Sequence, residues 1–92
     1  MPTKFNRVTI NATNYVVMDS SIKGTAFVTL NNPSGVVLRI AGESDSAPAA
    51  GTTVYTAVAS NSGAVYKFRC DPSKTWMLAA SGGGAIEIAI DY

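Results

Sequence analysis

The side chains in this sequence that could do chemistry are few, and two acidic residues come first. Glu43 and Asp45 stand two positions apart among serines, in the polar stretch ESDSAPAAG at 43–51. Their carboxylates and the nearby serines could bind calcium, but calcium takes about six to eight oxygens and no calcium-loop signature surrounds them. Glycoside hydrolysis by the same pair would need an enclosing cleft, which so short a chain has little material to build. We therefore expect a solvated loop and no metal.

The 92-residue sequence contains no histidine and a single cysteine, Cys70. Ser-His-Asp and Cys-His nucleophiles are therefore excluded, as are zinc sites made of cysteine and histidine. Ser73 and Lys74 could form a Ser/Lys dyad, but they follow an Asp-Pro turn signal. The glycines at 82–84 precede no helix that could bind phosphate, so they indicate a connection between strands. We expect no enzymatic activity and no bound cofactor.

Aromatic residues are the remaining candidates for a binding function. Because a ring offers a large contact area, four of them are candidate interface residues: Tyr15, Phe27, Tyr55 and Tyr92. Sugar stacking is the alternative, and it requires coplanar exposed rings, for which the sequence offers Tyr15, Tyr55 and Trp76. A monomer should not expose many apolar strand residues, so the Ala, Val and Phe27 side chains on outward strand faces indicate a homo-oligomer.

The charge disfavours nucleic acid as a partner. Seven basic and six acidic residues give a net charge of +1, and the basic residues form no run, whereas phosphate binding needs concentrated Lys and Arg. The tetrad at 66–69, Tyr-Lys-Phe-Arg, could suit single-stranded nucleic acid, but strand alternation sends its aromatic and basic side chains to opposite faces. No apolar run approaches the roughly 20 residues of a membrane span, and the first residues lack the apolar region of a secretory signal. We expect neither nucleic acid nor a membrane as a partner.

The elements that must position these residues are strands. Val, Ile and Thr, which fit a pleated sheet better than a helix, number 24, whereas Leu numbers three. Turn residues divide the chain at short intervals, as is typical of sandwiches and barrels. The predicted strands are 3–10, 14–19, 25–31, 36–43, 52–59, 64–70, 75–80 and 85–91. The turn Asn32-Pro33-Ser34-Gly35 predicts that 25–31 and 36–43 pair as a hairpin, and 43–51 is predicted to be the longest surface loop.

Period-two alternation assigns one face of each strand to the core. Lys67 and Arg69 point outward, either solvated or paired with Glu87 and Asp91 on a neighbouring strand, while Cys70 falls on a buried face. The predicted core is Val28, Leu30, Val36, Leu38, Ile40, Tyr66, Phe68, Trp76, Leu78, Ile86, Ile88 and Ile90. This pattern predicts an all-β fold in a single domain, 1–92: a small antiparallel β-sandwich of about eight short strands, with a small β-barrel as the alternative.

Four segments carry a resemblance to a known class of proteins. They are NNPSGVVL at 31–38, SAPAAGTT at 46–53, TWMLAA at 75–80 and AIEIAI at 85–90, the last two separated by a glycine run. Through them residues 24–92 resemble small virion proteins of tailed bacteriophages. The resemblance implies a non-catalytic capsid decoration, cement or head-tail component that self-associates, binds a shell lattice of capsid or tail proteins, and resides in virions assembled in the host cytoplasm. Residues 1–23 lie outside it and are a candidate docking extension.

Overall fold

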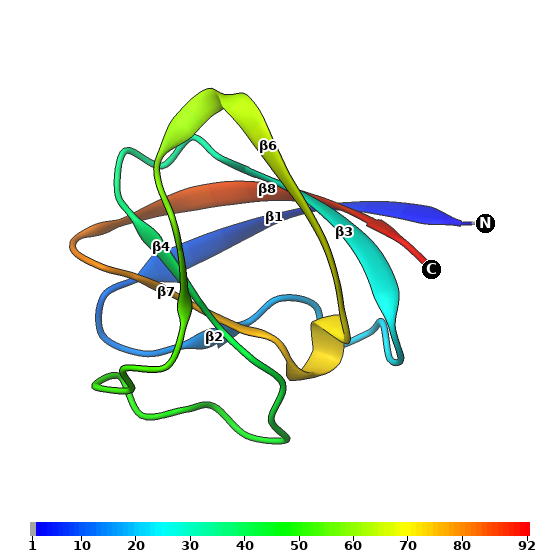
Figure 1. The fold of residues 1–92 in the computed structure, drawn as a ribbon, viewed down its shortest axis with the longest axis horizontal. Helices are drawn as coiled ribbons and strands as arrows, with labels where there is room; N and C mark the ends of the chain where they lie inside the picture. The colour runs from blue at the N-terminus through cyan, green and yellow to red at the C-terminus, as the bar shows by residue number, and fades with distance from the viewer. Residues whose placement is uncertain (1) are drawn as a thin grey trace.

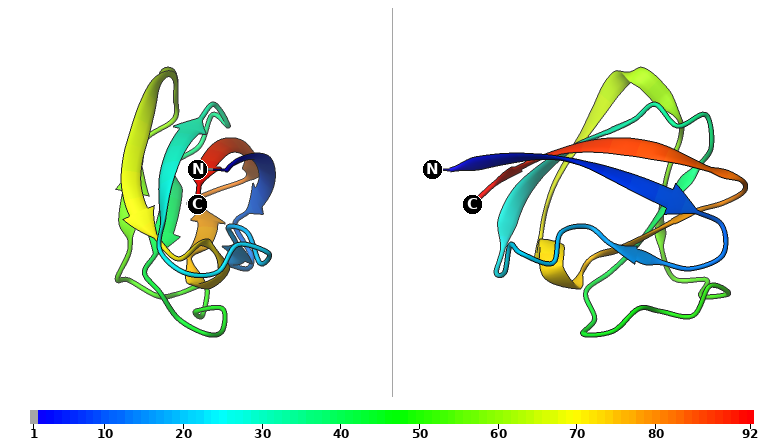
Figure 2. Two further views of the ribbon diagram at one scale, coloured as in Figure 1. Left: turned by 90° about the vertical axis from the view of Figure 1, so that its right-hand side faces the viewer. Right: turned by 180° about the vertical axis from the view of Figure 1, so that it is seen from behind.

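Eight strands form two four-stranded antiparallel sheets in the computed structural model, which describes residues 2–92 apart from the side chains of residues 62–64 (Figures 1 and 2). The first sheet has the order β1-β8-β3-β6 and the second the order β2-β7-β4-β5. The elements are β1 (Thr3–Asn11), β2 (Val16–Val17), β3 (Ala26–Asn32), β4 (Leu38–Ala41), β5 (Thr56–Val58), β6 (Asn61–Cys70), the 3-10 turn η1 (Pro72–Lys74), β7 (Trp76–Ala79) and β8 (Gly83–Asp91). The predicted all-β sandwich is confirmed.

The first sheet follows the alternation of its residues. Along β8 the isoleucines Ile86, Ile88 and Ile90 are buried while Glu87 is exposed, because successive side chains point to opposite faces of a strand. Strand β1 pairs with β8 along its whole length, from Thr3 opposite Asp91 to Asn11 opposite Gly83. The candidate docking extension, residues 1–23, thus supplies an edge strand of the sheet, and the chain ends lie side by side (Figures 1 and 2).

The predicted hairpin between 25–31 and 36–43 is wrong. Strand β3 pairs with β6 on one side and with β8 on the other, so neither of its edges is free for β4. The turn after β3 instead carries the chain from the first sheet to the second, where β4 pairs with β5 and β7. The turn residues predicted a reversal of the chain correctly, but local turn chemistry does not determine which strands become neighbours.

The crossing between the two sheets is fixed by a buried amide and a glycine. Nδ2 of Asn32, which is fully buried, donates to the carbonyls of Val36 at 3.0 Å and Val58 at 3.1 Å, and Ser34 Oγ donates to Asn32 Oδ1 at 2.6 Å. A Cβ on Gly84 would lie 2.6 Å from the Cβ of Ser34. The prediction that 82–84 is a connection between strands is only partly correct, because β8 already begins at Gly83. The absence of a side chain at Gly84 lets β8 pass close to the turn at Ser34.

The second sheet departs furthest from the predictions. The strands expected at 14–19 and 52–59 contract to two and three residues. The face assigned to 75–80 is reversed: Met77 and Ala79 enter the main core, whereas Leu78 and half-buried Trp76 belong to a second cluster with Tyr15 and Ala41 on the other side of the sheet. An apolar run in a central strand has no alternation from which to choose a face.

Of the other residues predicted to form the core, some are buried and some are not. Val28, Leu30, Leu38 and the three isoleucines of β8 are buried as expected. Val36, Ile40 and Phe68 are only half-buried against the core, and Tyr66 is 36% exposed. Residues that the prediction omitted complete the core, among them Ile10, Met18, Ile22, Val58 and Met77.

Candidate interaction surface

The outward side chains of the first sheet form a four-stranded exposed face, here called the outer face. The register places them in rows across β1, β8, β3 and β6. Three rows make up this face: Thr3, Asp91, Phe27 and Arg69; Phe5, Ala89, Thr29 and Lys67; and Arg7, Glu87 and Asn31. Contacts within the rows confirm that their members share a face, since Arg7 lies 3.1 Å from Glu87 and the Arg69 guanidinium lies 4.2 Å from the Phe27 ring centroid.

The outer face is apolar at its prominent positions. Phe5 is 81% exposed, and Phe27 is about half exposed. Beside Phe5 the face is hollowed to a volume of about 500 Å³. The small side chains of Ala89 and Thr29 share the row of Phe5, and the longer side chains of Arg7 and Glu87 border the hollow in the next row. A large aromatic ring next to a shallow hollow is a shape suited to protein contact.

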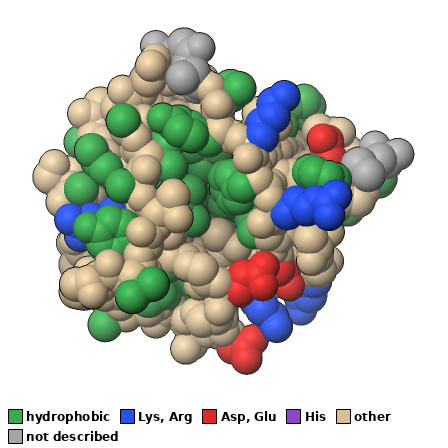
Figure 3. Space-filling model, in the orientation of Figure 1, with side chains coloured by type: hydrophobic (Ala, Val, Ile, Leu, Met, Phe, Trp, Pro, Cys, Tyr) green, Lys and Arg blue, Asp and Glu red, His purple; other side chains and the backbone are tan. Residues whose placement is uncertain are grey.

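A second apolar area lies at the open edge between the sheets. Tyr66 and Phe68 point from β6 toward the interior but remain partly exposed, because β5 is only three residues long and does not pair with β6. Figure 3 shows hydrophobic side chains gathered between β5 and β6. The two apolar areas occupy different sides of β6, since its side chains alternate between them.

The four predicted interface residues are not brought together. Tyr15 is buried, contrary to the expectation of an exposed ring, and its hydroxyl has no hydrogen-bond partner within the described part of the chain. Burial also raises the pKa of Tyr15 above its ordinary value. Phe27 lies on the outer face, Tyr55 lies beside the second sheet, and half-exposed Tyr92 follows β8, where its backbone N–H donates to the Pro2 carbonyl.

Phe5 is the surface residue that sequence reasoning missed. In the segment TKFNRVTI it has the same parity as Thr3, Arg7 and Thr9, which are all polar and all outward. A single aromatic residue on an otherwise polar strand face was therefore the available signal. Lys67 and Arg69 do point outward as predicted, but β3 separates them from β8, and Arg7 is the residue that pairs with Glu87.

The rings required for sugar stacking do not form a platform. Trp76 is half-buried and its Nε1 donates to the Ser44 carbonyl at 3.0 Å. Tyr55 is covered on one side by Arg39, whose guanidinium lies 4.7 Å from the ring centroid. With Tyr15 buried, these three residues present no pair of open coplanar faces.

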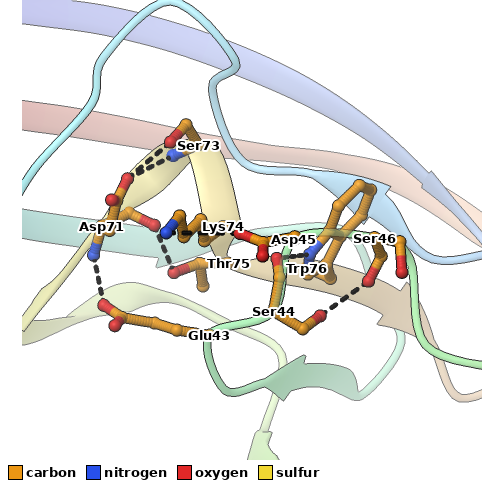
Figure 4. Close-up of polar contacts among 9 residues, drawn as sticks. All are labelled: Glu43, Ser44, Asp45, Ser46, Asp71, Ser73, Lys74, Thr75 and Trp76. Atoms are coloured by element: carbon orange, nitrogen blue, oxygen red, sulfur yellow. Dashed lines mark hydrogen bonds and ion pairs between the residues drawn. The ribbon is translucent and has the colours of Figure 1, made fainter.

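The acidic pair of the polar loop is engaged in fastening that loop to η1 (Figure 4). Glu43 Oε1 accepts from the Asp71 backbone N–H at 2.6 Å, and Asp45 lies 3.3 Å from Lys74 Nζ. The Ser44 backbone N–H donates to the Lys74 carbonyl at 3.0 Å. These contacts hold the first part of the connection 42–55 against the body of the molecule, which is a structural role.

Ser73 and Lys74 do not form a dyad either. Ser73 Oγ donates to Asp71 Oδ1 at 2.7 Å, and this bond is the main reason why the pKa of Asp71 lies below its ordinary value. The hydrogen bond with Asp45 raises the pKa of Lys74, so its ammonium stays protonated rather than serving as a base. Cys70 is buried, as predicted, and burial raises the pKa of its thiol.

An ion pair between a buried carboxylate and a partly exposed lysine joins two segments at one end of the sandwich. Asp19 Oδ2, in a side chain only 4% exposed, lies 2.8 Å from Lys4 Nζ, and Asp19 Oδ1 accepts from the Ser21 hydroxyl at 2.6 Å. Burial alone would raise the pKa of Asp19, but the bonds from Lys4 and Ser21 outweigh it and hold the pKa below the ordinary 3.8. The pair joins β1 to the segment before β3.

Comparison with models of protein families, with curated proteins and with solved structures finds no match to this chain. Over the described residues, no three His, Cys, Asp or Glu side chains come together in a group that could hold a metal ion. Nor does this part of the chain contain a helix long and apolar enough to cross a membrane.

Proposed function

We propose that this chain is a non-catalytic structural subunit of a phage virion, a capsid decoration, cement or head-tail component that acts by binding copies of itself and a shell lattice. One observation carries the proposal: large apolar side chains stand exposed on the outer face, led by Phe5 at 81% exposure. Exposed apolar strand surface of this kind is a feature of proteins that assemble, because a monomer gains nothing by presenting it to water.

The arrangement of the apolar surface supports a lattice in particular. The outer face and the open edge between β5 and β6 are separate areas, so one copy can contact two different neighbours at once. The connection 42–55, here called the polar connection for its residues 43–46, stands at the end of the molecule where η1 lies (Figures 1 and 2). It is placed to remain exposed in an assembly.

Self-association is tested by sedimentation velocity over a concentration series from micromolar to millimolar. The expected result is a sedimentation coefficient that rises with concentration as the monomer is converted to an oligomer of defined mass. A monomer across the whole range would overturn the self-association part of the proposal.

The virion assignment is tested separately on purified particles of the phage that encodes the chain. Quantitative mass spectrometry of gradient-purified virions is expected to find the chain in many copies per particle. Its absence from the particles would overturn the assignment, even for a protein that self-associates in solution.

A further inference from the structure

The outer face has two halves of different shape, a hollow on one side and long side chains on the other. The hollow lies over β1, β8 and β3, between Phe5 and the Arg7–Glu87 pair. The other half, toward β6, carries the long exposed side chains of Lys67 and Arg69. A surface with a hollow at one side and projecting side chains at the other can pair with a second copy of itself.

We propose that the outer face binds the outer face of a second copy about a two-fold axis that runs along the strands. In this arrangement β6 of each copy lies over β1 of the other, and β3 lies over β8. The proposal rests on the proposed function, because it identifies the surface through which the chain self-associates.

The distribution of charge selects this axis. Both carboxylates of the face, Glu87 and Asp91, lie on the inner strand β8, whereas its cations lie on the outer strands, Arg7 on β1 and Lys67 and Arg69 on β6. A two-fold axis across the strands would place β8 on β8 and β6 on β6, which brings like charges together. An axis along the strands lays each row on the same row of the partner, so Arg69 comes beside the partner's Asp91. Arg7 on β1 also lies under β6, but it stays one row away from the partner's Lys67 and is neutralised by Glu87 at 3.1 Å.

The row order then identifies the contacts that we expect. Phe5 comes under the partner's Lys67, whose aliphatic stem and ammonium both suit an exposed ring. Ala89 comes under the partner's Thr29, and these small residues let the sheets approach to the usual spacing of about 10 Å. The partner's Arg69 comes over Thr3, within reach of the Asp91 carboxylate that Thr3 Oγ1 bonds at 2.6 Å.

The first test compares two equally exposed apolar residues. Phe5, 81% exposed, lies on the outer face, and Val54, 82% exposed, lies in the connection before β5. By sedimentation equilibrium, Phe5→Ser is expected to raise the dissociation constant of the self-associated form by at least about tenfold, as for a large aromatic side chain that becomes buried in an interface. Val54→Ser is the matched control and is expected to leave that constant within about twofold. Near-ultraviolet circular dichroism confirms that both variants stay folded.

The second test exchanges charges across the interface. Arg69→Asp alone is expected to weaken self-association, and adding Asp91→Arg in the same chain is expected to restore it, because every copy then offers the reversed pair. Restoration by the second change distinguishes an intermolecular pairing from local damage to the sheet.

The outcomes separate this inference from the proposed function. Self-association that Phe5→Ser leaves unchanged, or that the double exchange does not restore, would overturn the outer-face pairing and leave the assembly role standing. A wild-type chain that remains monomeric at every concentration would overturn the assembly role itself.

Discussion

The ionisation of Asp19 is linked to the stability of the fold. Its carboxylate is buried, yet it is compensated by Lys4 Nζ at 2.8 Å and by the Ser21 hydroxyl and backbone N–H. Because its pKa in the folded chain lies below the ordinary 3.8, the unfolded chain takes up the proton first as the pH falls. The carboxylate therefore stabilises the fold fully above that value, and its contribution is lost as the pH falls through the lower folded pKa.

Asp19→Asn removes this ionisation and is the first prediction. At neutral pH we expect a loss of about 1–3 kcal/mol in the free energy of unfolding, because the Lys4 ammonium and the Ser21 donors lose a charged acceptor. Urea titrations at a series of pH values should also show a flatter decline of stability than in the wild type as the pH falls below about 4.

Asp45→Asn is the matched control for this prediction. Asp45 also forms an ion pair, with Lys74, but its side chain is 90% exposed. Its removal is expected to change stability by no more than about 0.5 kcal/mol, since exposed pairs are screened by water and salt. An Asp19→Asn chain as stable at neutral pH as the Asp45→Asn chain would show that the buried pair does not stabilise the fold.

At the scale of the elements, the sequence predicts strands well and their neighbours poorly. The alternation of β8 is fully visible in AIEIAID, and the burial of Ile86, Ile88 and Ile90 follows it. The pairing of β3 with β6 and β8, by contrast, joins segments far apart in the chain, and nothing local in 25–31 indicates it. The bounds of the short strands β2 and β5 are predicted poorly for a related reason. Their length depends on which strands they pair with more than on the β-propensity of their own residues.

The candidate surface was predictable to a similar extent. Phe27, Lys67 and Arg69 could be assigned to outward faces because their strands alternate. Tyr15 could not, because it precedes a two-residue strand and its burial depends on the second cluster with Trp76 and Leu78. That cluster exists only because β2 and β7 become neighbours in the folded chain.

The contact between β8 and the turn after β3 gives the second prediction. A methyl group at residue 84 would lie 2.6 Å from the Cβ and 3.1 Å from the carbonyl oxygen of Ser34, and no flexible side-chain end is there to move aside. Gly84→Ala is expected to lower the free energy of unfolding by about 1–3 kcal/mol, the usual cost of overpacking. Chemical denaturation monitored by Trp76 fluorescence measures it.

Gly42→Ala provides the comparison at a glycine of the opposite kind. A Cβ at Gly42 would meet no atom within 4 Å, so the same methyl group is expected to be neutral or slightly stabilising. Equal effects at the two positions would mean that the close passage of β8 past Ser34 is not a constraint on the fold.

At the scale of the whole molecule, the chain ends and the connection 42–55 both lie outside the hydrophobic core. The Tyr92 backbone N–H donates to the Pro2 carbonyl at 3.0 Å, so the two ends of the chain meet. The connection 42–55 is held by its first residues, and beyond Ser46 it is largely exposed. Neither region belongs to the core, which the two sheets enclose between them.

A circular permutation is the third prediction and follows from this arrangement. Joining residues 92 and 2 through about five Gly and Ser residues, and reopening the chain between Ala49 and Ala50, removes no core contact, so we expect cooperative unfolding close to that of the wild type. Reopening it between Ser34 and Gly35 instead frees the turn that Asn32 holds from inside the core, and this permutant is expected to be much less stable or unfolded. Thermal denaturation of both permutants measures the difference. Equal stability would mean that the crossing between the sheets is no more important to the fold than the connection 42–55.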